Sequence, residues 1–103
     1  MLRVFRVKGS SLYPEYRNGD YVITAWSPFA FKRLNLGDIV AFKHPKYGLL
    51  IKQVTHIDRE MGLLEVQGTI LESFDSRNFG PIPVHSVLGK MIWHVKAPRK
   101  NIP

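Results

Sequence analysis

Cysteine is absent from the 103 residues, which excludes a disulfide framework, a thiolate metal site and a cysteine nucleophile. Long apolar runs are also missing. No unbroken aliphatic run is longer than that of Leu49-Leu50-Ile51, which is far below the roughly 20 residues that a membrane helix needs. The basic start, residues 1–6, leads into no apolar segment of the kind found in a secretory signal. The sequence therefore predicts neither an export signal nor a transmembrane segment, and we expect a cytoplasmic protein.

Acidic residues are scarce: the chain has 8 Asp and Glu against 15 Lys and Arg, giving a net charge of +7. Such a charge attracts phosphates and acidic surfaces. The basic residues are spread along the chain, however, and no nucleic-acid recognition motif accompanies them. We therefore interpret them as a solvated surface and expect no nucleic-acid partner. A basic, non-enzymatic β module that binds nucleic acid or a partner protein stays open as an alternative.

Short runs rich in β-branched and aromatic residues, separated by Gly and Pro, indicate strands. These runs are residues 3–7, 21–26, 39–42, 49–57, 63–67 and 87–95. Residues 29–34 form either an apolar excursion or one helical turn, and residues 68–83 are expected to be irregular. The pattern predicts an all-β fold with little or no helix, a small barrel or folded ribbon. We expect one domain over residues 1–96 and a basic tail over 97–103.

A serine lies in a short bend near the start of the chain. The bend reads Gly9-Ser10-Ser11-Leu12-Tyr13-Pro14 and is closed by Gly19-Asp20. A serine hydroxyl is a poor nucleophile on its own, and it needs a base within hydrogen-bond reach and donors for the oxyanion that it creates. The functional question is therefore whether the chain supplies that base.

Lys52 is the best candidate for the base. It interrupts the apolar run Leu49-Leu50-Ile51 before Val54, and a strand that is apolar on both faces is usually buried. Burial disfavours the ammonium form and lowers the pKa, so the amine can act as a general base near neutral pH. Ser-Lys pairs are a known variant of the catalytic triad. The alternative is that Lys52 extends its ammonium to the rim of the sheet.

The other candidates are weaker. The histidines His44, His56, His85 and His94 lie in no recognisable motif. They are too scattered for a recognisable metal site, so we predict no metal and no cofactor.

The irregular segment contains Ser73-Phe74-Asp75-Ser76-Arg77. A neutral lysine amine needs a hydroxyl partner to fix its direction, and an Asp-Arg pair can hold a loop in place. Alone, this pentapeptide would be interpreted as a polar turn.

In this order, the motifs resemble those of the type I signal peptidase family of serine-lysine peptidases. The family pattern is Gly-x-Ser-Met-x-Pro, Gly-Asp, Gly-Asp-Ile/Val-Val, Lys-Arg-Val and Ser-x-Asp-Ser-Arg-x-x-Gly. The corresponding segments here are residues 9–14, 19–20, 37–40, 52–54 and 73–80, so the resemblance covers nearly the whole chain. Leu12 stands in place of the usual Met, and Gln53 in place of an Arg.

The resemblance implies a role for each matching residue. Ser11 would be the nucleophile and Lys52 the general base, with Ser73 orienting the lysine amine. Asp75 and Arg77 would brace the loop as an ion pair, and Ser76 would join that network.

The resemblance also implies an oxyanion site and a substrate. The backbone N–H of Ser11 would be one oxyanion donor, Ser10 is a candidate for the second, and Leu12 and Tyr13 would line the substrate. The substrate would be a precursor protein or its leader peptide, and the sequence does not specify an oligomeric state.

Membrane-anchored signal peptidases carry an N-terminal transmembrane segment, and many carry a second β domain. This sequence shows neither, and such compact members resemble the proteases that mature nickel-type superoxide dismutase by removing an N-terminal leader. The nickel would then belong to the substrate. The alternatives are a general signal-peptidase-like enzyme and the related peptidase domain of self-cleaving SOS repressors.

Overall fold

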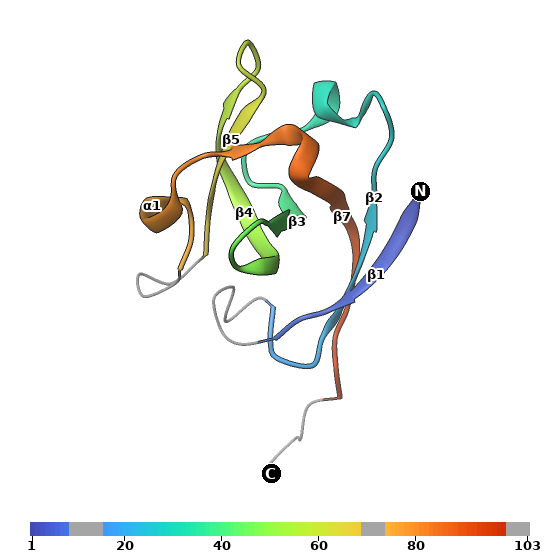
Figure 1. Cartoon of the computed structure of the whole chain (residues 1–103). Helices are drawn as coiled ribbons and strands as arrows, with labels where there is room; N and C mark the ends of the chain where they lie inside the picture. Colours follow the sequence, from blue (N-terminus) through green and yellow to red (C-terminus); the bar gives the residue numbers. More distant parts are fainter. Residues whose placement is uncertain (9–15, 69–73, 99–103) are drawn as a thin grey trace.

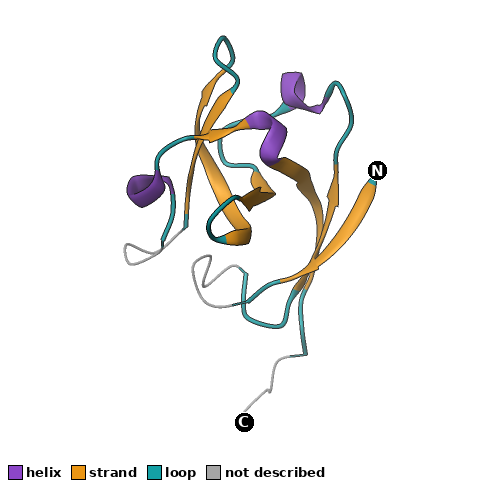
Figure 2. Cartoon of the chain, in the orientation of Figure 1, coloured by secondary structure: helices purple, strands orange, loops and turns teal. Residues whose placement is uncertain are grey.

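The computed structural model describes residues 1–8, 16–68 and 74–98. Strands dominate the described chain and the helices are short (Figures 1 and 2), which confirms the mainly β fold expected from the sequence. The strands are β1 (Leu2–Arg6), β2 (Tyr21–Ala25), β3 (Ile39–His44), β4 (Gly48–Asp58), β5 (Leu63–Gln67), β6 (Ile82–Pro83) and β7 (Val87–Val95). The helical segments are the 3₁₀ turns η1 (Ala30–Arg33) and η2 (Val84–Ser86) and the short helix α1 (Ser76–Phe79).

All of these strands belong to one antiparallel sheet with the order β1-β2-β7-β3-β4-β5-β6. The last strand of the sequence, β7, therefore lies inside the sheet, where Ile23 of β2 pairs with Trp93 and Val40 of β3 pairs with Lys90. In Figure 1, β1 and β2 run along one side of β7, and β3 and β4 lie on its other side. Strand β7 thus joins two halves of the sheet that share no other pairing within the described residues.

Glycine permits the tight reversals on either side of the long strand β4. Gly48 (φ 75°) follows the turn from β3, and Gly62 (φ 66°) ends the hairpin loop before β5. Both have a positive φ, which is strained for residues with a Cβ. The loop after β4 closes a hairpin in which Asp58 pairs with Leu63, and an irregularity between Val54 and His56 then shifts the register so that Val54 pairs with Val66.

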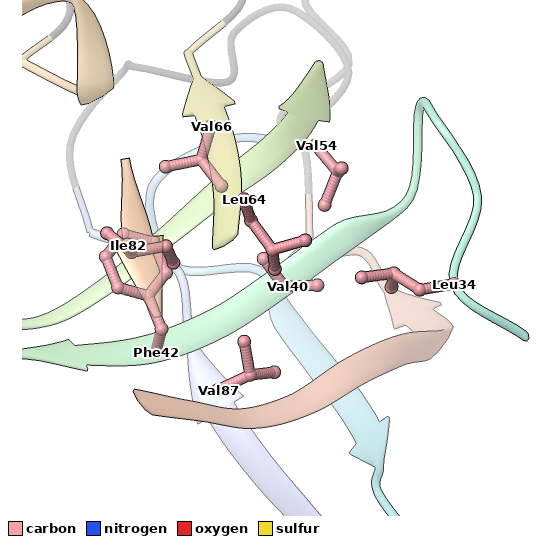
Figure 3. Packing of buried hydrophobic residues seen from close by; sticks show 8 residues of the cluster. All are labelled: Leu34, Val40, Phe42, Val54, Leu64, Val66, Ile82 and Val87. Atoms are coloured by element: carbon pink, nitrogen blue, oxygen red, sulfur yellow. The ribbon is translucent and has the colours of Figure 1, made fainter. Parts of the chain in front are cut away.

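The larger core cluster lies in the β3–β7 half of the sheet. Figure 3 shows its eight buried side chains converging from β3, β4, β5, β6, β7 and the segment after η1. They are Leu34, Val40, Phe42, Val54, Leu64, Val66, Ile82 and Val87. A second, smaller cluster of Val7, Tyr16, Val22 and Ile39 lies toward β1 and β2. The two clusters meet at β3, because Ile39 belongs to one and Val40 to the other.

The structure settles one segment that the sequence left undecided and corrects the prediction for another. Residues 30–33 form one 3₁₀ turn, and Phe31 packs against the larger core while Phe29 is exposed. The segment expected to be irregular contains α1 and β6, because Asp75 caps the helix and Ile82 pairs with Leu64. Within the residues that the structure describes, no helix combines the length and apolar character needed to cross a bilayer.

Candidate functional site

Lys52 lies in the middle of β4, opposite Val40 of β3. Its side chain is 5% exposed, so the burial predicted from the apolar run is confirmed. The reason differs in part from the prediction, because β4 is not buried on both faces: Leu49 on the opposite face is 48% exposed. Lys52 is buried on the face that carries Leu50 and Val54, and both of these pack with the larger core cluster.

Burial sets the charge of the Lys52 amine. Desolvation is the largest influence and lowers its pKa from the ordinary value of 10.5. The carboxylate of Asp75 acts in the opposite direction and raises the pKa, while the Arg77 guanidinium lowers it. The net result is a lowered pKa, which increases the fraction of neutral amine at any pH below 10.5. A buried amine of this kind is suited to accepting a proton.

Asp75 and Arg77 form the charged part of the site. The Asp75 side chain is fully buried, and its two oxygens accept hydrogen bonds from Nε (2.9 Å) and Nη2 (2.7 Å) of Arg77. Such a two-point contact fixes the orientation of both groups. The backbone N–H of Gly68 donates to the same carboxylate at 2.8 Å. Asp75 therefore connects the end of β5 to α1 and also supplies negative charge near Lys52.

The start of α1 is fixed by a capping box. The Asp75 carboxylate accepts from the backbone N–H of Arg77 at 3.0 Å, and the Asn78 side chain accepts from the backbone N–H of Asp75 at 3.2 Å. These bonds satisfy donors that a helix N-terminus otherwise leaves without partners. A helix of only 4 residues is not stable by itself, so its caps and side-chain anchors hold it in place.

Ser76 is the anchor of α1 on the sheet. Its Oγ donates to the carbonyl of Val66 at 2.6 Å and accepts from the N–H of Val66 at 2.9 Å. The hydroxyl thus takes the place of a neighbouring strand for one residue of β5. The contact is buried, and Asp75 directly precedes Ser76 in the chain. The contact therefore keeps Asp75 close to β5.

The bend that contains Ser11 is closed at its base by the main chain. The N–H of Val7 donates to the carbonyl of Asp20 at 2.7 Å, and the N–H of Gly19 donates to the carbonyl of Val7 at 2.9 Å. Ile51, the neighbour of Lys52 in β4, packs against the smaller core cluster, to which Val7 belongs. The base of the bend and the strand of the lysine therefore share one packed cluster.

Asp20 anchors the base of the bend, a role that the sequence did not reveal. Its fully buried carboxylate accepts from the N–H groups of Arg17 (3.0 Å) and Ala97 (2.8 Å) and lies 2.7 Å from Nε2 of His94. The His94 ring also packs against the ring of Tyr16 in a tilted arrangement, with centroids 4.5 Å apart. The only signal in the sequence was the Gly19-Asp20 pair, because His94 lies 74 positions from Asp20.

The predicted site residues thus divide into two groups. The structure brings Lys52, Asp75, Ser76 and Arg77 together between β4, β5 and α1. The other predicted residues lie outside the described ranges: Ser10, Ser11, Leu12, Tyr13 and Ser73.

Comparison with known proteins gives two matches. The sequence profile of the family described as signal peptidase, peptidase S26, matches residues 1–60. Signal peptidase I V of Bacillus subtilis (strain 168) is 24% identical to this chain. The alignment is 135 positions long and covers 82% of this chain and 80% of the relative. The profile match includes the bend with Ser11 and the strand with Lys52.

Proposed function

Because this chain belongs to the signal peptidase family, peptidase S26, we propose that it is a serine endopeptidase with a Ser11-Lys52 dyad. The observation that carries the proposal is the burial of Lys52, whose side chain is 5% exposed and whose pKa is lowered by desolvation. A buried amine adds nothing to a charged docking surface, whereas a lysine that acts as a general base must be neutral, and burial favours the neutral form. We assign the peptidase activity to a domain spanning residues 1–96.

The proposed reaction is acyl transfer. Neutral Lys52 accepts the proton of the Ser11 hydroxyl as Oγ attacks the scissile carbonyl carbon. The resulting oxyanion accepts a hydrogen bond from the backbone N–H of Ser11, with Ser10 as a candidate second donor. The Lys52 ammonium then gives its proton to the leaving amine as the peptide bond breaks. An ester between Ser11 and the leader is left.

Hydrolysis of that ester uses the same base. Lys52, neutral again, takes a proton from water as the water oxygen attacks the ester carbonyl carbon. Collapse of the second oxyanion breaks the bond to Oγ, and the ammonium returns the proton to Ser11. In this scheme Ser73 orients the Lys52 amine. Asp75, Ser76 and Arg77 hold the loop to which Ser73 belongs.

We further propose that the substrate is a precursor protein that loses an N-terminal leader, with nickel-type superoxide dismutase as the specific candidate. The resemblance to compact maturation proteases supports this choice. A general signal-peptidase-like substrate and self-cleavage of the SOS-repressor type are the alternatives. They differ in what is cut, so one cleavage assay separates them.

The test is incubation of the purified protein with a dismutase precursor and, separately, with a secretory precursor, followed by mass spectrometry of the new N-termini. We expect trimming of the dismutase precursor at one bond, and no trimming by Ser11→Ala or Lys52→Met. Lys32→Met, which removes an exposed lysine from η1, is the matched control and keeps full activity. Trimming of both precursors would support the general enzyme.

The rival function is a basic module without catalysis, which the net charge of +7 favours. It predicts that Ser11→Ala and Lys52→Met leave function intact and that substitution of exposed Lys and Arg abolishes binding. Trimming by the Ser11→Ala variant, or no trimming of any leader by the wild-type protein, would remove the peptidase proposal.

A further inference from the structure

An aromatic cluster lies where the turn after β3 meets α1. We define it as His44, Tyr47, Phe74 and Phe79. The ring centroids are 4.8 Å apart for His44 and Phe79, 4.6 Å for Tyr47 and Phe74, and 5.6 Å for Phe74 and Phe79. The rings come from two segments that are distant in sequence, so the contacts hold α1 against the β3–β4 hairpin.

The cluster has an inner and an outer side. Phe79 forms the inner side, because it packs against the larger core and its ring lies 6.4 Å from that of Phe42. Tyr47 and Phe74 form the outer side and stay 41% and 44% exposed. Phe79 already covers the core beneath Tyr47 and Phe74. The core therefore does not need these two exposed rings as a cover. Exposed aromatic pairs of this kind are typical of binding surfaces.

The outer rings lie on the same side of the sheet as the proposed base, which is itself buried. Strand β4 begins at Gly48, directly after Tyr47, and Gly48 and Lys52 point to the same face of the sheet. At about 3.3 Å per residue, the 4 steps from Gly48 to Lys52 span about 13 Å. From the other side, Phe74 directly precedes Asp75, whose charge acts on Lys52. The aromatic cluster and Lys52 are therefore separated by only a few residues along β4.

An extended peptide lying along β4 would span the same distance. Its residues also repeat every 3.3 Å or so, so a side chain about three to five residues from the scissile bond reaches the outer rings when that bond lies at Lys52. We propose that the aromatic cluster is a specificity subsite for one aromatic or large aliphatic side chain of the substrate. This inference rests on the proposed peptidase function and names what that enzyme would select.

Charge narrows the choice of side chain. The ammonium of Lys46 lies 5.4 Å from the centre of the Tyr47 ring, and Lys43 is exposed on the adjoining strand. The hairpin sequence from Lys43 to Leu50 contains no acidic residue. A lysine or arginine of the substrate would meet like charge here and find no partner on the hairpin. The subsite therefore favours apolar rings and chains and rejects cations.

The test measures kcat/KM for peptides that span the cleaved bond, with Ala, Leu, Phe or Lys placed singly at each of six positions on either side. We expect one position, about three to five residues from the bond, at which Phe or Leu is cleaved about 10-fold faster than Ala. Lys at that position should be the poorest substrate. The side on which the preferred position falls, leader or mature protein, gives the direction of the bound chain.

Three variants connect this preference to the cluster. Phe74→Ala and Tyr47→Ala should each remove most of the preference for the Phe or Leu peptide over the Ala peptide. Phe74→Leu keeps apolar bulk and should retain it. Tyr21→Ala is the matched control, because Tyr21 is 44% exposed on the distant strand β2. Thermal melting of each variant reports whether it is folded.

The possible outcomes separate this inference from the function on which it rests. Cleavage with no positional preference, or a preference that persists in folded Phe74→Ala and Tyr47→Ala, overturns the subsite and leaves the peptidase in place. Failure of the wild-type protein to cleave any peptide or precursor removes the peptidase function and the subsite with it.

Discussion

Nε2 of His94 lies 2.7 Å from Oδ2 of Asp20 and links the end of β7 to the residue that precedes β2. The carboxylate is fully buried and also accepts two backbone N–H groups. With Asp20 ionised, its carboxylate only accepts, so Nε2 is the donor of this bond in that state. The pair therefore fastens the base of the bend that contains Ser11 to the interior strand of the sheet.

Removing this histidine should destabilise the fold. We expect His94→Ala to lower the free energy of unfolding by about 1–3 kcal/mol, because a buried carboxylate loses one of its donors. His94→Gln, which retains an N–H donor at similar reach, should recover part of the loss. His85→Ala at the exposed turn η2 is the control and should change little. Urea unfolding measures all three, and equal stability of His94→Ala and wild type would contradict the assigned role.

The pH dependence of activity should report the charge of Lys52. The proposed mechanism requires the neutral amine, so kcat/KM should rise with pH through the lowered pKa of Lys52 and level off below 10.5. Arg77→Gln removes a cation that lowers this pKa and also frees Asp75 from its ion pair. Both effects raise the pKa of Lys52, so the rise in activity should shift to higher pH.

The control for this shift is Arg33→Gln, which removes a cation at the end of η1, away from the site. It should leave the midpoint unchanged. An acid shift of the midpoint in Arg77→Gln would mean that the sign of the electrostatic argument is wrong.

The stability of the fold should also depend on the charge of Lys52. Between the lowered pKa of Lys52 and 10.5 the unfolded state binds more protons than the folded state, so the free energy of unfolding rises with pH. Lys52→Met should remove that part of the slope.

Ser76 should matter for stability as much as for the site. Ser76→Ala leaves both the N–H and the carbonyl of Val66 without their present partner, at a cost of about 1–3 kcal/mol. The Val66 amide should also exchange its hydrogen faster. Ser86→Ala is the matched control, because its hydroxyl bonds the carbonyl of Pro83 in an exposed setting. If both variants lose the same stability, burial is not what makes the Ser76 contact important.

The strands were predictable from sequence because their pattern is local. Residues 63–67 and 87–95 were predicted with the bounds that the structure has, and the runs at 21–26 and 49–57 differ from it by a residue or two at an end. Alternation and Gly-containing turns determine such segments without reference to the rest of the chain. The burial of Lys52 was predictable in part, because Leu50 and Val54 on its own face are apolar, but the exposure of Leu49 on the other face was not expected.

What remained hidden depends on contacts between distant segments. Helix α1 has 4 residues and no helical period, and it forms because Asp75 caps it and Ser76 bonds β5. His94 gave no signal of its own, because its partner is on another strand. The aromatic cluster likewise joins residues that the sequence places in two different loops. The Ser76 contact, the His94 contact and the aromatic cluster all depend on which segments the sheet brings together. A single sequence does not reveal that arrangement.

The interior position of β7 has a consequence for how the protein is made. Lys52 lies in the half of the sheet from β3 to β6, and the base of the Ser11 bend lies in the half from β1 to β2. The strand that unites them, β7, is the last of the described strands to leave the ribosome. A growing chain therefore carries the serine and the lysine of the proposed dyad before β7 can pair the two halves of the sheet. In this architecture the proposed dyad gains its full framework only after β7 has been made.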